Sequence, residues 1–173
     1  KHALRALQAE PVGPFQAVKA ISFSGEYPFG WFEFNDADLP VRLSMECCSI
    51  LVPLNARDSA IPAAVFRLTA RNLRDAPATV TFLASQQNPV GNPLNGQQAA
   101  ARKMQGYGQN VNTVVRRAGW TRIHMTGKTD TGPSCGDLVL AVDAEDARAA
   151  ASWETLQALG DALAGGTLGG EDK

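Results

Sequence analysis

The stretch from Ser24 to Asn72, "SGEYPFGWFEFNDADLPVRLSMECCSILVPLNARDSAIPAAVFRLTARN", decides the fold, because side chains alternate along much of it. Residues 41–48 place Val41, Leu43, Met45 and Cys47 at every second position. Residues 63–72 repeat the alternation, with Phe66, Leu68 and Ala70 on one side. A period of two is typical of β-strands with one buried face. The stretch therefore predicts antiparallel strands.

The rest of the chain extends this pattern. Beyond a turn at residues 72–78, residues 79–85 read as a strand that completes a hairpin with residues 63–72. Residues 112–117 and 121–128 predict a second hairpin around Gly119, and residues 136–145 predict a further strand. Ser152 is a plausible N-cap for a short helix that Gly165 and Gly166 end. We expect an all-β fold, an antiparallel β-sandwich with long loops and one short helix near the C-terminus.

Composition narrows the function classes. Sixteen Lys and Arg against seventeen Asp and Glu give a formal net charge of -1. The protein therefore has no excess of positive charge that would attract a nucleic-acid backbone or an anionic lipid surface. The sequence predicts neither nucleic-acid binding nor a membrane span. Three cysteines cannot all pair within one chain, and Cys47 and Cys48 point to opposite faces of a strand. Reduced thiols indicate a cytoplasmic setting.

Motifs for catalysis and metal binding are missing from the sequence. It contains no phosphate loop, no dinucleotide fingerprint and no paired ligand spacing of a zinc site. Nothing brings Cys47 and His124 together, and His124 is expected on the polar face of its strand. Glu33 and Asp36, within a run of acidic residues, are expected to face solvent. We therefore predict no catalytic residue, no metal and no cofactor.

The aromatic residues between Tyr27 and Phe34 leave two interpretations open. Alternation places Trp31 and Phe32 on opposite faces, where they could fill a core or cover a neighbouring domain. Flat rings also stack on the apolar faces of sugars, and amide side chains bind sugar hydroxyls. The sugar-binding candidates are Tyr27, Trp31, Asn88, Asn92 and Trp120. Asn88 and Asn92 belong to a loop over residues 88–108 that is rich in Asn, Gly and Pro.

The order and spacing of several motifs resemble one known family. The turn Gly25-Glu26-Tyr27-Pro28 precedes "LPVRLSME" and then "VPLNARDSAIPAAVF", and the strand ends at Asn72. "SQQNPVG" and "NVNTVVRRAGWTRIHMT" continue the likeness. Together these segments resemble the N-terminal domain of glycoside hydrolase family 116, which includes β-glucosidases and the non-lysosomal glucosylceramidase.

The resemblance implies a β-sandwich that packs on an (α/α)6 catalytic domain of a retaining β-glycosidase. In that family both catalytic carboxylates belong to the helical domain, so none is carried over to this chain. We accordingly expect residues 1–173 to form a single β-sandwich domain, an incomplete piece of the N-terminal domain of a larger glycosidase. Its expected partners are the C-terminal catalytic domain of the same polypeptide and a glycan or glycolipid head group.

Overall fold

The computed structural model describes residues 3–90, 110–127, 136–144 and 146–166. The chain divides into two compact units, Lys1–Leu83 and Ala84–Lys173, which we describe one at a time. The expectation of a single domain stays a prediction.

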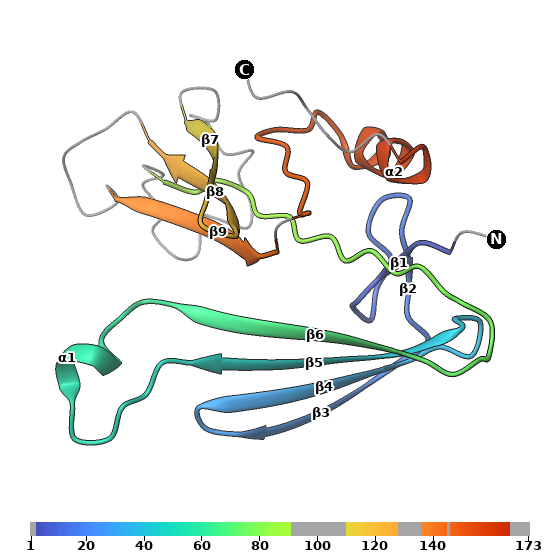
Figure 1. Ribbon diagram of the computed structural model, residues 1–173, viewed down its shortest axis with the longest axis horizontal. Helices are drawn as coiled ribbons and strands as arrows, with labels where there is room; N and C mark the ends of the chain where they lie inside the picture. Colours follow the sequence, from blue (N-terminus) through green and yellow to red (C-terminus); the bar gives the residue numbers. More distant parts are fainter. Residues whose placement is uncertain (1–2, 91–109, 128–135, 145, 167–173) are drawn as a thin grey trace. The chain divides into compact units, whose positions relative to one another are not determined.

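The first unit contains a four-stranded antiparallel sheet (Figure 1). Its strands follow chain order: β3 (Ala20–Glu26), β4 (Phe29–Asn35), β5 (Val41–Ser49) and β6 (Ala64–Asn72). A small parallel pair, β1 (Arg5–Ala6) and β2 (Gln16–Ala17), precedes the sheet. The strands predicted at residues 41–48 and 63–72 are confirmed as β5 and β6.

The core of the first unit lies on one face of this sheet. Phe34 on β4 pairs with Leu43 on β5, and both side chains are buried with Val18 and Val41. Phe32 packs against this cluster from the same face as Phe34, while Trp31 takes the opposite face. The predicted alternation of Trp31 and Phe32 is thus confirmed.

The prediction of a strand at residues 79–85 is wrong, since the structure has no strand there. β6 pairs along its whole length with β5, across the longer connection formed by residues 50–63. A β-type side-chain pattern needs a backbone partner to become a strand. Residues 79–85 have none, and Val80 and Phe82 stay exposed.

The second unit contains a three-stranded antiparallel sheet in the order β7 (Val111–Arg117), β8 (Trp120–Thr126) and β9 (Asp137–Asp143). The predicted hairpin is confirmed: Ala118 and Gly119 join β7 to β8 with φ values of 51° and 81°. Two positive φ angles match the type I′ turn that suits the twist of a hairpin. Met125 is the most deeply buried side chain of this sheet, at 1% exposure.

Two short helices complete the described structure. α2 (Leu156–Ala164) is the predicted helix, but its N-cap is Thr155 and not Ser152. Thr155 Oγ1 accepts a hydrogen bond from the Ala158 amide at 3.1 Å, which leaves the preceding residues outside the helix. α1 (Ala56–Ser59), in the connection between β5 and β6, was not predicted. Antiparallel sheets with two short helices confirm the all-β class.

Candidate functional site

An aromatic patch lies on the face of the first sheet opposite its core. Trp31 pairs with Glu46 on β5, and Glu46 pairs with Arg67 on β6. Trp31 Nε1 donates a hydrogen bond to Glu46 Oε2 at 3.3 Å, and Arg67 Nη1 lies 3.9 Å from Glu46 Oε1. The Phe29 ring stacks on Trp31, with 5.8 Å between centroids and 20° between planes. We call these four residues the aromatic patch.

The sequence candidates Tyr27 and Trp31 belong to the same hairpin of this unit. Tyr27 lies in the turn between β3 and β4, before a cis peptide bond to Pro28, and its side chain is 78% exposed. The Ser49 amide donates to the Pro28 carbonyl at 3.2 Å, so the end of β5 lies beside this turn. The hairpin therefore presents Tyr27 and the aromatic patch to solvent from the first sheet.

The other described candidates belong to the second unit. Trp120 begins β8, where it pairs with Arg117 and Asp143, and its side chain is exposed. Asn88 precedes β7 and is buried. Asn92 lies outside the described residues. The candidate set is thus divided between the two units.

Asn88 stabilises the second unit through its side-chain amide. Its Nδ2 donates to Asn112 Oδ1 at 2.7 Å and to the Thr126 carbonyl at 3.1 Å. Its Oδ1 accepts from the Val90 amide at 3.0 Å, and Asn110 Nδ2 donates to the Asn88 carbonyl at 3.1 Å. These bonds join the segment before β7 to β7 and β8. The role of Asn88 in sugar binding stays a prediction, and its observed role is structural.

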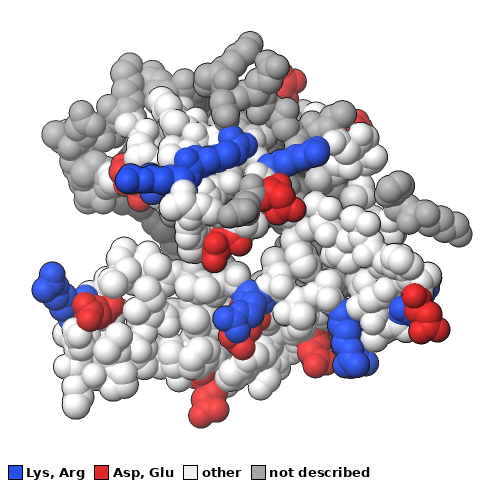
Figure 2. Space-filling model, viewed as in Figure 1, with Lys and Arg blue, Asp and Glu red and all other residues white. Residues whose placement is uncertain are grey.

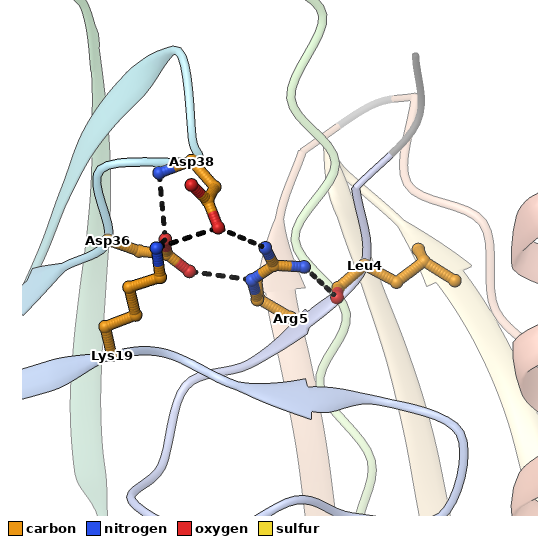
Figure 3. A network of polar contacts seen from close by, with 5 residues as sticks. All are labelled: Leu4, Arg5, Lys19, Asp36 and Asp38. Carbon is orange, nitrogen blue, oxygen red and sulfur yellow. Dashed lines mark hydrogen bonds and ion pairs between the residues drawn. The ribbon is translucent and has the colours of Figure 1, made fainter.

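An ion-pair network anchors the N-terminal segment of the first unit (Figure 3). Arg5 Nε donates to Asp36 Oδ2 at 2.7 Å, and the Asp38 amide donates to Asp36 Oδ1 at 3.0 Å. Lys19 Nζ lies 2.8 Å from Asp38 Oδ2. The Asp36 side chain has no exposed surface, so the prediction that it faces solvent is wrong. The basic partners come from distant residues, which local strand periodicity does not reveal.

Opposing effects act on the pKa of Asp36. Burial disfavours the ionised carboxylate, but hydrogen bonds from Arg5 and the Asp38 amide favour it. The positive charges of Arg5 and Lys19 add to that effect, and the pKa of Asp36 is held below its ordinary value. Asp36 is therefore a structural carboxylate that stays ionised beside Arg5.

The sequence of the chain matches one known protein family. Residues 2–164 match the family model described as beta-glucosidase 2, glycosyl-hydrolase family 116 N-term. The chain belongs to this family. The predicted resemblance is thereby confirmed over nearly the whole length of the family 116 chain.

Cys47 and His124 belong to different units of the chain. Cys47 is a free, partly buried thiol of the first unit, whereas His124 belongs to the second. As predicted, His124 lies on the same face as Arg122, and its Nε2 is 2.9 Å from Asp137 Oδ2. Within the described ranges of the family 116 chain, no three His, Cys, Asp or Glu side chains gather to form a metal site.

Surface charge is mixed on the family 116 chain. Acidic side chains lie beside basic ones on the face shown in Figure 2. Among the helices of the described segments, none has the length and apolar content needed to cross a lipid bilayer. The exposed surface of the first unit includes Phe29 and Trp31, with Glu46 and Arg67 as polar groups beside them.

Proposed function

We propose that this chain is a non-catalytic N-terminal domain that packs on and supports a C-terminal (α/α)6 catalytic domain of the same polypeptide. The parent enzyme would be a retaining β-glucosidase or a glucosylceramidase-like hydrolase. The observation that carries this proposal is the match of residues 2–164 to the N-terminal part of family 116. The match concerns the N-terminal part of a β-glucosidase.

The exposed apolar side chains of the first unit support a docking role. Phe23 on β3 and Phe66 on β6 share the core-side face of the sheet but remain more than half exposed. Leu54, between β5 and β6, is fully exposed. Burial of these side chains against another folded domain would remove their apolar surface from water.

A comparison of the isolated chain with the intact enzyme tests the non-catalytic role. We expect residues 1–173, once shown to be folded by circular dichroism, to hydrolyse no aryl β-glucoside, whereas the intact polypeptide hydrolyses it. Glu46→Gln in the intact polypeptide should retain activity, because Glu46 binds Trp31 and Arg67 and is not a catalytic carboxylate. Turnover by the isolated chain that disappears with Glu46→Gln would contradict the proposal.

A carbohydrate-binding module is the second candidate function, and the aromatic patch favours it. The stacked Phe29 and Trp31 rings provide a flat apolar surface, and Glu46 and Arg67 provide an acceptor and donors for hydroxyl groups beside it. The ligand would be a glycan or a glycolipid head group.

Calorimetric titration with glucosides and oligosaccharides tests this second function. We expect Trp31→Ala to abolish binding and the matched change Trp153→Ala, at an exposed tryptophan of the second unit that is not a sugar-binding candidate, to leave binding intact. Absence of any heat with the wild-type protein at millimolar sugar would exclude the module and favour a scaffold role alone.

We also propose a cytoplasmic location. Cys47 and Cys48 are free thiols on adjacent residues of β5, as expected in a reducing compartment. Alkylation of the native protein in cell extracts, followed by mass spectrometry, should find both thiols reduced.

A further inference from the structure

The connection between β5 and β6 holds Leu54 in an unusual position. Its side chain is fully exposed, with a relative accessible area of 109%. Its backbone has a φ of 63°, in the left-handed region that glycine and asparagine favour and leucine avoids. The positive φ is unfavourable for leucine, and the exposed side chain makes no contact in the described structure that compensates for it. An outlier of this kind points to a contact outside the described structure.

The residues around Leu54 are fixed by hydrogen bonds. Ser59 Oγ accepts from the Val52 amide and donates to the Val52 carbonyl, both at 3.0 Å. The Asn55 amide donates to the Val52 carbonyl at 3.1 Å, and Asn55 Oδ1 caps α1 by accepting from the Asp58 amide at 3.1 Å. Leu54 therefore projects from a preorganised loop, so little conformational entropy remains to be lost when the side chain is buried.

Further apolar side chains surround this projection along the chain. Leu51, Val52 and Ile61 belong to the same connection and are each exposed. The connection lies at the end of the sheet that also carries the turn at Tyr27 (Figure 1). We call residues 51–61 the docking loop. Its charged side chains, Arg57 and Asp58, have opposite signs, so the docking loop has no excess of positive charge to attract an anionic lipid surface.

We propose that Leu54 inserts into an apolar pocket of the catalytic domain that follows in the same polypeptide. The inference rests on the proposed function and deepens it by naming the element that makes the contact. A loop with one projecting leucine is small beside the roughly 800 Å² per partner that a stable complex of free proteins buries. A tethered domain experiences an effective concentration in the millimolar range, and a small apolar contact then suffices. This argument favours the tethered catalytic domain over a second copy of the chain.

Photochemical cross-linking in the intact polypeptide tests the proposal. A photoreactive phenylalanine derivative replaces Leu54 in one variant and Leu73 in the matched control. Leu73 is also an exposed leucine of the first unit, but it follows β6 at the opposite end of the sheet. We expect the probe at position 54 to form an intramolecular cross-link to a peptide of the catalytic domain, and the probe at position 73 to form none. A cross-link between two chains, or to residues 84–173, would overturn the proposal.

A stability measurement on the same polypeptide gives an independent readout. Leu54→Asp should shorten the half-life of β-glucosidase activity at elevated temperature by at least about fivefold, and Leu73→Asp by less than about twofold. Aspartate tolerates a positive φ, so Leu54→Asp does not strain the loop itself. Equal half-lives for Leu54→Asp and Leu73→Asp would refute the docking role of Leu54.

Probes at Phe23 and Phe66 distinguish failure of this inference from failure of the proposed function. If either of them reaches the catalytic domain and the probe at position 54 does not, domain packing stands and the role of Leu54 is refuted. If no probe at any of these positions reaches the catalytic domain, the proposed packing of the two domains is itself refuted.

Discussion

Replacing Asp36 with asparagine removes the buried carboxylate at the centre of the network with Arg5 and Lys19. A hydrogen bond to a charged partner contributes about 1.5–3 kcal/mol, and loss of one member of a buried ion pair costs about 3–5 kcal/mol. Arg5 is 14% exposed and would recover part of its hydration, and the new amide oxygen can still accept from the Asp38 amide. We therefore expect Asp36→Asn to lower the free energy of unfolding of the first unit by about 2 kcal/mol.

Urea denaturation followed by Trp31 fluorescence measures this change. Trp120 and Trp153 lie in the second unit, so a Trp120→Phe, Trp153→Phe background restricts the signal to the first unit. With a denaturant slope of about 1 kcal/mol per molar urea, the transition midpoint should fall by about 2 M.

Asp38→Asn is the matched control for this experiment. Asp38 is 60% exposed and pairs with Lys19 at the surface, so its replacement should leave the midpoint nearly unchanged. Equal midpoints for Asp36→Asn and the parent protein would refute the conclusion that the buried pair stabilises the first unit.

Three further predictions follow from the same structure. In acid the urea midpoints of Asp36→Asn and the parent protein should converge. The pKa of Asp36 is lower in the folded state than its unfolded-state value of about 3.9, so the carboxylate stabilises the folded protein above that value, and this stability is lost as the pH falls through the folded-state pKa. Divergence in acid would contradict this sign. Ala118→Asn should stabilise the second unit by about 0.5–1 kcal/mol, since asparagine before Gly119 suits a type I′ turn; an unchanged or lower melting temperature would count against it. Asn88→Ala leaves the Val90 amide without its acceptor and should cost about 2 kcal/mol, measured as faster amide exchange at Val90. Unchanged exchange would show that the bond contributes nothing.

Alternation was sufficient to predict those strands whose two faces differ in burial. On β5, Val41 and Leu43 are buried while Arg42 is exposed, and the sequence shows that difference directly. The β7–β8 hairpin was predictable for another local reason, since Gly119 tolerates the positive φ that its turn requires. In both cases the signal lies within a few residues of the element that it specifies.

Features that depend on a distant partner were not predictable from the sequence pattern. Residues 79–85 have the side chains of a strand, but no strand pairs with them, and β6 remains the edge strand of its sheet. Asp36 has the composition of an exposed turn residue, yet Arg5, 31 residues away in sequence, neutralises it and permits its burial. Thr155 and Ser152 are both good N-caps, and only the path of the backbone selects between them.

The candidate site shows the same difference between features set by local sequence and features that depend on a distant partner. Its aromatic members, Tyr27 and Trp31, were identified from residue type and spacing. Their polar neighbour Glu46 was not, because its position beside Trp31 depends on the register between β4 and β5. The exposed leucine at position 54 was also missed, since an apolar residue in a loop gives no sign of its exposure until the backbone is known.

The turn at Asp36 links the stability of the first unit to its aromatic patch. Asp36 accepts from the Asp38 amide through its side chain and from the Leu39 amide through its carbonyl, and these bonds set the length of the turn between β4 and β5. A slip of one residue in that turn would invert the faces of β5 and exchange Glu46 beside Trp31 for a residue of the core side. The ion pair with Arg5 thus stabilises a register on which the patch depends. A variant that weakens the turn should accordingly lose the interaction between Trp31 and Glu46 along with stability.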